Sequence, residues 1–278
     1  MSFNLKSGMK IAKVKGGKDD GLVIYLDEPS FIKGKSDEVK DIETEDGGIM
    51  VPLPCENHHE CLFVGGPSGS GKSTYIGNYI KQYMKTFPNK EIILFSAVKS
   101  DKSLDEIKKL RRYDLSDDSM IEHPIDVKNL EGSLCIFDDY TQVKSKAMRE
   151  AVQDLLERVI TTGRCHAEEK LTKRQMRERD IDVIVTSHQF QAYQDTRSIL
   201  NECTSLTCFP GSGSAYQIKS VLRIYAGLSP KDIAHIYSLP SRWITFSKWF
   251  PQYILYERGA YVLSKEPKKK DVTKKESS

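Results

Sequence analysis

The sequence predicts an α/β fold in which a doubly wound, mainly parallel sheet carries helices on both faces. Short β-prone runs alternate with helix-forming stretches through the centre of the chain, a pattern typical of parallel strands joined by crossover helices. A glycine-rich loop at 66–71 joins one of these runs to a helix, as at a phosphate-binding turn. The length of 278 residues suits one large domain with additions.

The first 54 residues are expected to form an N-terminal β-rich arm (1–54). Its runs MKIAKV (9–14) and LVIYL (22–26) are β-prone, and the turn-forming stretch GGKDDG separates them. The main domain is predicted over 55–264. Its expected central strands are CLFV (61–64), EIILFS (91–96), SLCIF (133–137) and IDVIVTS (181–187), with helices over 72–83 and 147–160.

The chain after Thr196 is expected to form a small C-terminal α+β extension. We predict a helix, the strand SLTCF, the turn PGSGS, and a helix that Ser229 caps and Pro230 begins. Three β-prone pieces, WITFS, YILY and YVL, follow. The basic stretch 265–278 has almost no apolar residues and is predicted to be a disordered tail.

The run EEKLTKRQMRERD (168–180) is charged and has little apolar content. It predicts a solvated helical excursion, with a DNA-facing or partner-facing lid as the alternative. The net charge of +3 is nearly balanced, so the whole molecule is not a polycation that coats nucleic acid. The six cysteines form no dense framework, and no apolar run approaches a bilayer span of about 20 residues. We therefore expect a soluble, intracellular protein without a membrane segment.

The segment GPSGSGKS (66–73) matches the P-loop pattern at each fixed position and lies between an apolar strand and a helix. Its glycines let successive backbone N–H groups turn towards phosphates. Lys72 is expected to reach the β- and γ-phosphates, and the Ser73 hydroxyl to coordinate Mg²⁺. ATP and Mg²⁺ are the predicted cofactors, and a glycine-rich turn without a ligand is the alternative. The predicted nucleotide-binding residues are Gly66, Pro67, Ser68, Gly69, Ser70, Gly71, Lys72, Ser73 and Thr74.

Two aspartates follow the apolar strand SLCIF, where P-loop enzymes place the acidic half of the site. Asp138 is expected to hold Mg²⁺, directly or through water. Asp139 stands where ATPases with an additional strand between the two halves of the site carry the carboxylate that polarises the attacking water. A carboxyl pair at a strand end can instead cap the following turn.

Further catalytic candidates follow other strands and helices. Gln189 comes directly after the strand IDVIVTS and His188, where a polar residue can sense the γ-phosphate or orient water. His188 either shares that role or closes the strand structurally. Phosphoryl transfer also needs a cation beyond the lysine and metal, for which Arg164 and Arg197 are candidates. Arg164 is preferred to Arg197, and each arginine is also a plausible surface ion-pair partner.

The cluster Cys55, His58, His59 and Cys61 superficially offers four zinc ligands. Structural zinc sites draw two ligand pairs from separated turns, whereas Cys61 begins the apolar strand before the P-loop. The spacing therefore argues against a zinc site.

Taken together, four segments of the chain resemble the genome-packaging ATPases of nucleocytoplasmic large DNA viruses and virophages, in the FtsK–HerA class of P-loop motors. The resemblance covers about 61–263 and includes the pair Arg242 and Trp243 in GLSPKDIAHIYSLPSRW. The four segments are GPSGSGKS, CIFDD, GRCHAE and VTSHQFQAYQDTRSILNECTSLTCFP. The resemblance implies an additional-strand P-loop fold.

The resemblance also implies roles for single residues. It assigns nucleotide and Mg²⁺ binding to Lys72 and Ser73, hydrolysis to Asp138 and Asp139, and sensing to Gln189. Arg164 matches the arginine of the family's Gly-Arg-His segment, although Cys165 stands between Arg164 and the histidine.

The implied function is DNA-stimulated ATP hydrolysis by a homo-oligomeric ring that pumps viral double-stranded DNA into a preformed capsid. The implied partners are DNA and a capsid or portal-vertex protein, in the host cytoplasm, a viral factory or the virion. A nucleoside or metabolite kinase, with RQMRERD as its lid, is one alternative. A slow ATP-binding switch or scaffold is another, suggested by Asp139 in place of glutamate.

Overall fold

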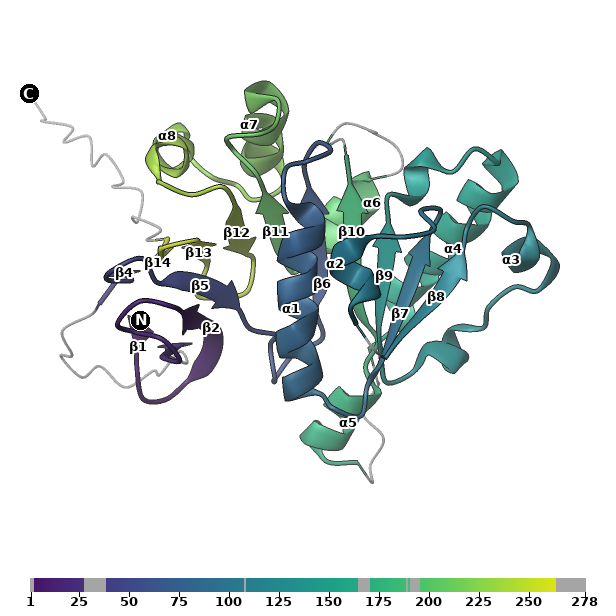
Figure 1. Cartoon of the computed structure of the whole chain (residues 1–278), viewed down its shortest axis with the longest axis horizontal. Helices are drawn as coiled ribbons and strands as arrows, with labels where there is room; N and C mark the ends of the chain where they lie inside the picture. Colours follow the sequence, from purple (N-terminus) through teal and green to yellow (C-terminus); the bar gives the residue numbers. More distant parts are fainter. Residues whose placement is uncertain are drawn as a thin grey trace, which may run out of the picture.

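The computed structural model describes residues 3–27, 39–107, 109–164, 171–188, 190 and 196–263. A ten-stranded sheet, in the order β4-β14-β13-β12-β11-β6-β10-β9-β7-β8, runs through the molecule (Figure 1). Six neighbouring strands from β8 to β11 pair in parallel. They are β6 (Cys61–Gly65), β7 (Glu91–Ser96), β8 (Leu110–Asp114), β9 (Ser133–Asp138), β10 (Asp182–Ser187) and β11 (Ser205–Cys208).

Strand β10 lies between the strand that precedes the P-loop and the strand that precedes the two aspartates. Ser187 pairs with Gly65 on β6, and Val185 pairs with Phe137 on β9. The carboxyl ends of the three strands therefore meet at one edge of the sheet, which we call the carboxyl edge. This order confirms the predicted additional-strand type of parallel sheet.

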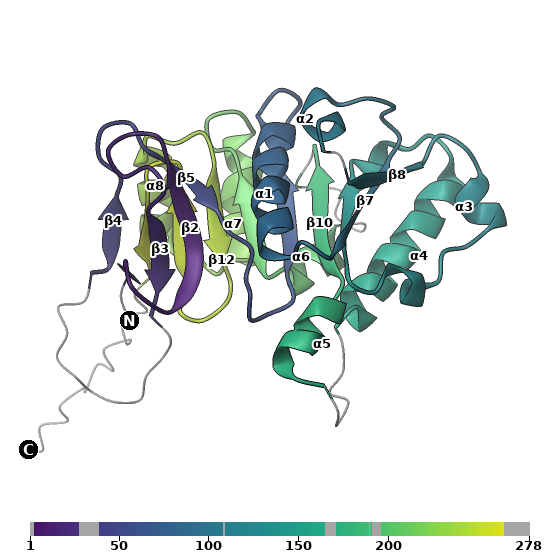
Figure 2. The same ribbon diagram turned by 60° about the horizontal axis from the view of Figure 1, so that its bottom comes forward.

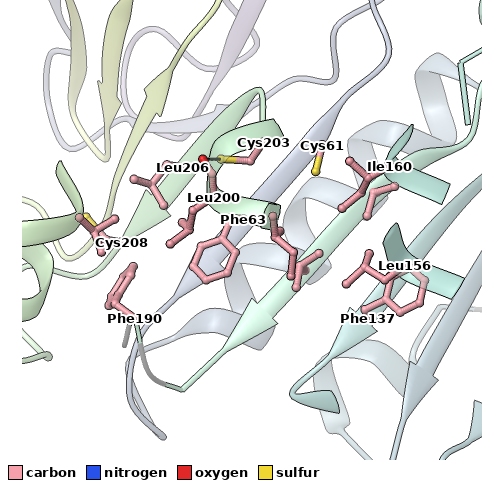
Figure 3. Packing of buried hydrophobic residues seen from close by; sticks show 14 of the residues in the cluster. Cys61, Phe63, Phe137, Leu156, Ile160, Phe190, Leu200, Cys203, Leu206 and Cys208 are labelled. Carbon is pink, nitrogen blue, oxygen red and sulfur yellow. Dashed lines mark hydrogen bonds between the residues drawn. The ribbon is translucent and has the colours of Figure 1, made fainter. Parts of the chain in front are cut away.

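The central strands are apolar throughout because helices or a second sheet cover both of their faces. Side chains alternate between faces, so Leu62 and Val64 pack towards α1 (Lys72–Thr86), whereas Cys61 and Phe63 pack towards α4 (Lys146–Thr162). Figure 3 shows the second layer, in which Phe137 of the sheet lies beside Leu156 of α4, and Phe63 lies near Leu200 and Phe190. Burial of each such side chain contributes roughly 1.5–3 kcal/mol. The predicted helices on both faces are thereby confirmed.

Antiparallel strands extend the sheet on the other side of β11. They are β12 (Ile244–Ser247), β13 (Tyr253–Tyr256), β14 (Gly259–Val262) and β4 (Asp41–Glu43). A four-stranded sheet of β1 (Phe3–Asn4), β2 (Met9–Lys15), β3 (Val23–Leu26) and β5 (Ile49–Pro52) packs beside α1 (Figure 2). One strand from the first 54 residues, β4, thus belongs to the large sheet.

Shorter helices complete the described fold. They are α2 (Lys102–Asp105), α3 (Ser119–Glu122), α5 (Lys173–Arg179), α6 (Arg197–Glu202), α7 (Ala215–Ile224) and α8 (Pro230–Ser238), with 3₁₀ turns at Val127–Leu130 and Tyr140–Gln142. The predicted cap of α8 is confirmed, because the Ser229 hydroxyl accepts from the backbone N–H of Asp232. Helix α7 was not predicted. Within the described residues, no helix is long and apolar enough to cross a membrane.

The charged run 168–180 differs from the expected solvated excursion in its described part. Helix α5 turns Arg177 inward, where it is 5% exposed and its Nη1 lies 2.7 Å from Asp182 Oδ2. Lys90 Nζ lies 2.9 Å from the same oxygen, and the Tyr83 hydroxyl also donates to it. A fully buried carboxylate requires such partners, so Arg177 is a structural residue. The predicted tail 265–278 lies outside the described residues.

Candidate nucleotide site

The P-loop turn joins β6 to α1 at the carboxyl edge. Gly69 and Gly71 adopt φ angles of 77° and 105°, a region that side-chain-bearing residues rarely enter. At Gly66 a Cβ atom would lie 2.8 Å from Phe209 Cδ2 and 2.8 Å from Ser70 Oγ, so a larger residue would displace the loop. Helix α1 begins at Lys72, and its first backbone N–H groups form an anion-binding end.

The side chain of Lys72 turns back towards the loop. Its Nζ donates to the Gly66 carbonyl oxygen at 2.8 Å and lies 3.0 Å from His188 Nδ1. Burial lowers the pKa of Lys72, and the nearby carboxylate of Asp139 opposes this effect. The ammonium is therefore held beside the loop by weak acceptors that phosphate oxygens can replace.

Asp138 ends β9 with both carboxylate oxygens held by neighbouring strands. Ser96 Oγ donates to Oδ2 at 3.0 Å, and Thr186 Oγ1 donates to Oδ1 at 2.8 Å. The backbone N–H of Asp139 donates to the same Thr186 hydroxyl at 2.9 Å. Thr186 therefore orients the two aspartates relative to each other, and the free lone pairs of Asp138 stay available for a cation.

Asp139 adopts a left-handed backbone conformation with φ 44°, which aspartate tolerates better than most residues. Its Oδ2 lies 2.8 Å from His188 Nε2, whereas its buried Oδ1 has no hydrogen-bond partner among the described residues. Burial raises the pKa of Asp139, and Lys72 opposes that rise. A carboxylate oxygen with a raised pKa and no partner suits a base that accepts a proton from water.

His188 connects the two halves of the site. It accepts from Lys72 at Nδ1 and donates to Asp139 at Nε2, which corresponds to the neutral tautomer with its proton on Nε2. The P-loop lysine and the expected hydrolytic carboxylate are thus linked through one imidazole ring.

A pocket of about 410 Å³ brings the predicted residues of both halves together. Its lining comprises Pro67, Ser68, Gly69, Gly71, Lys72, Ser73, Thr74, Val98, Asp101, Asp138, Asp139 and His188. Gly66 and Ser70 lie in the loop behind it, and the Ser70 hydroxyl is buried without a partner among the described residues. The pocket offers backbone N–H groups, a cation and two carboxylates within one cavity. These are the groups that bind a nucleoside triphosphate and its metal ion.

The residues present also fit Mg²⁺. Ser73 and Asp138 both line the pocket, and they offer the hydroxyl and carboxylate oxygens that this hard cation prefers. Among the described residues, no group of three or more histidine, cysteine, aspartate or glutamate side chains could hold a metal. A cation at this place would therefore take its remaining ligands from phosphate oxygens and water.

Of the remaining catalytic candidates, the two described residues, Arg164 and Arg197, do not line the pocket. Gln189 lies outside the described residues. Arg164 is exposed beyond the end of α4, where the Gly163 carbonyl oxygen accepts from Ile181 N at 2.8 Å. Ile181 precedes β10, so Arg164 lies at the opposite edge of the sheet from the P-loop. Arg197 is exposed at the start of α6.

The structure adds four residues that were not expected from the sequence: Ser96 and Thr186, which hold the aspartates, and Val98 and Asp101, which line the pocket. Ser96 and Thr186 occupy the carboxyl ends of strands adjacent to β9. Their position as polar residues at the ends of apolar strands was the available signal.

No protein-family model matches the chain. The chain is 35% identical over 268 residues to a protein of Sputnik virophage described as uncharacterized protein V3, covering 93% of this chain and 97% of that protein. The pCW3 conjugation coupling protein TcpA with ATPγS is 13% identical, covering 92% of this chain and 77% of that chain, with a TM-score of 0.48. The genome packaging NTPase B204 from Sulfolobus turreted icosahedral virus 2 with ATPγS is 15% identical, covering 72% and 96%, with a TM-score of 0.41.

Proposed function

We propose that this chain, which belongs to the family of virophage proteins that includes Sputnik protein V3, is an ATP-driven motor that packages viral double-stranded DNA. The observation that carries the proposal is the pocket in which the P-loop lysine and the Asp138–Asp139 pair meet across β10. The resemblance of the four sequence segments supports packaging as the use of this ATPase.

Nucleotide binding begins with an exchange of contacts at Lys72. The ammonium leaves the Gly66 carbonyl oxygen and His188 and turns to the β- and γ-phosphates, which are stronger, charged acceptors. The loop N–H groups and the start of α1 hold the phosphates in line. Ser73 and Asp138 would hold Mg²⁺, which when bound would neutralise charge that develops on the phosphate oxygens.

Hydrolysis then requires a base at the γ-phosphate. Asp139 accepts a proton from the attacking water at the carboxylate oxygen that has no partner among the described residues. After His188 is released from Lys72, its imidazole keeps the bond to Asp139, so the ring can hold that carboxylate oriented while the water approaches. Gln189 is proposed to orient the same water.

The proposed partners are double-stranded DNA, a capsid or portal-vertex protein, and further copies of this chain in a ring.

Arg164 lies at the edge of the sheet away from its own pocket, so it can stabilise phosphoryl transfer only in the pocket of a neighbouring subunit. Such an arginine is worth about 10³–10⁵ in turnover in related phosphoryl-transfer enzymes.

ATP hydrolysis by the purified protein with and without double-stranded DNA tests the proposal. We expect turnover that DNA stimulates and that Lys72→Ala and Asp139→Asn each abolish. Lys81→Ala is the matched control, because Lys81 lies on the same helix and is exposed. Transfer of the γ-phosphate to a nucleoside or metabolite, or turnover indifferent to DNA, would contradict the motor.

A further inference from the structure

The outer face of α7 carries large side chains that no described element covers. Tyr216 is 75% exposed and Ile224 is 58% exposed. Lys219 and Arg223, also exposed, lie between them on the same face. The helix is anchored by its opposite face, through Ile218, Val221 and Leu222. Apolar side chains that flank two cations on one helix face form a surface suited to a protein partner.

The charge around α7 is one-sided. The stretch 205–256 contains a single acidic residue, Asp232, which is engaged in the cap of α8. The same stretch contains five basic residues: Lys219, Arg223, Lys231, Arg242 and Lys248. We call the exposed part of this region, formed by Tyr216, Lys219, Arg223, Ile224 and Lys231, the basic face.

The end of the molecule that carries α3 has the complementary charge. The stretch 114–131 contains six acidic residues and one basic residue, Lys128. Asp117, Asp118 and Glu122 are exposed around α3, and Ile121 beside them is 38% exposed. None of these three acids forms an ion pair within the part of the chain that the structure describes. We call this surface, Asp117–Glu122, the acidic end.

The two surfaces lie on the same side of the sheet, with α3 at one end of the molecule and α7 nearer its middle. Buried side chains of α3, α4 and α7 belong to the same hydrophobic cluster. Figures 1 and 2 both place α3 at one end of the molecule, away from α7 and α8. One protomer therefore cannot satisfy both surfaces by itself. A repeated contact between unlike surfaces generates a ring or a filament.

We propose that the basic face of one protomer binds the acidic end of a second copy of this chain. This inference rests on the proposed ring motor and gives it a subunit contact. A self-symmetric contact through α7 would oppose Lys219 and Arg223 to like charges, which is unfavourable. The exposed Tyr216, Ile224 and Ile121 supply apolar contact that a phosphate backbone would not use.

The contact also brings the neighbour close to the nucleotide. Gly213 immediately precedes α7, and a Cβ atom on it would lie 3.6 Å from Pro67 Cδ in the P-loop. A protomer seated on α7 therefore lies beside the loop that holds the phosphates.

Charge reversal on each surface tests the inference by sedimentation of the full chain with ATP. Lys219→Glu/Arg223→Glu and Asp117→Lys/Asp118→Lys are each expected to raise the apparent dissociation constant of self-association at least about 100-fold. An equimolar mixture of the two variants should assemble again, because each restores the other's contact. Lys6→Glu/Lys15→Glu is the matched control for the basic-face variant, because it makes the same change in net charge on exposed residues of the N-terminal region. It should assemble like the unmodified chain.

Three outcomes would overturn the inference. The unmodified chain could stay monomeric with ATP and DNA, or the mixture could fail to assemble although both variants melt like the unmodified chain. The basic-face variant could instead lose DNA binding while self-association is unchanged, which would make α7 a nucleic-acid surface. DNA-stimulated turnover that Lys72→Ala abolishes is measured separately, so the motor can stand when the contact fails.

Discussion

Thr186→Val tests whether the hydroxyl between the two aspartates organises the magnesium site. Thr186 is 1% exposed, donates to Asp138 Oδ1 at 2.8 Å and accepts from Asp139 N at 2.9 Å. Valine keeps the shape but removes both hydrogen bonds. The charge-assisted bond to Asp138 is worth about 1.5–3 kcal/mol, and the orphaned N–H costs about 1–3 kcal/mol.

Loss of a residue that orients a metal ligand typically lowers metal affinity or activity about 10- to 100-fold. We therefore expect the Mg²⁺ concentration for half-maximal ATP turnover to rise by that factor. The assay is a Mg²⁺ titration of turnover at saturating ATP, with urea unfolding measured in parallel.

Thr207→Val is the matched control for this experiment. Thr207 is also fully buried, and its hydroxyl bonds to Tyr75 and Thr245 at 3.1 and 2.8 Å, on a strand that lacks the aspartates. It should lose comparable stability and keep its Mg²⁺ requirement. Equal Mg²⁺ requirements in the two variants, at equal turnover, would refute the role assigned to Thr186.

Three further predictions concern other parts of the fold. Asp182→Asn should lower the free energy of unfolding by about 3–5 kcal/mol in urea, because it removes the fully buried carboxylate that pairs with the buried cations of Lys90 and Arg177; a loss under about 1 kcal/mol would contradict this. Burial raises the pKa of Glu60 to about 7 from 4.5, so the folded state keeps a proton that the unfolded state has released. Stability should therefore fall as pH rises from about 4.5 to about 7, by at most about 3 kcal/mol, and urea unfolding of Glu60→Gln should lack this slope. Arg164→Ala should lower turnover at least about tenfold with ATP affinity unchanged, and weaker ATP binding would argue that Arg164 serves its own pocket.

The parallel core could be predicted because its strands are apolar throughout and its turns carry strong signals. The predicted helix over 72–83 begins at the observed residue and extends to Thr86. Strand β8 escaped prediction because its sequence, LRRYD, contains two arginines and lacks an apolar run. It is the outermost strand of the sheet, where one side of the strand has no neighbour and charged residues are tolerated. Helix α7 was missed because the glycine- and serine-rich turn before it indicates a loop, although Ser214 then caps the helix.

In the site as well, residues that belong to local sequence patterns could be predicted, and residues brought together by the fold could not. Lys72 and Ser73 follow from the fixed spacing of the P-loop, and the aspartate pair from its place directly after an apolar strand; the structure brings them into one pocket. Ser96 and Thr186 come from different segments, and their contacts with Asp138 depend on strand register, which no local pattern specifies. Arg177 sits in a run of charges that looks solvated, and only the position of Asp182 on the neighbouring strand explains its burial.

The pairing of β4 with β14 has a consequence for how the chain folds. The Tyr256 hydroxyl donates to Glu43 Oε1 at 2.9 Å although the two residues are 213 positions apart, and Glu43 also pairs with Gly259 in the sheet. Contacts between such distant segments form slowly, because a long loop has to close before they contribute. During synthesis, the ATP-binding half emerges from the ribosome before the partner of β4 exists. The antiparallel end of the sheet can therefore be completed only after β14 has been synthesised, and until then β4 has no β14 to pair with.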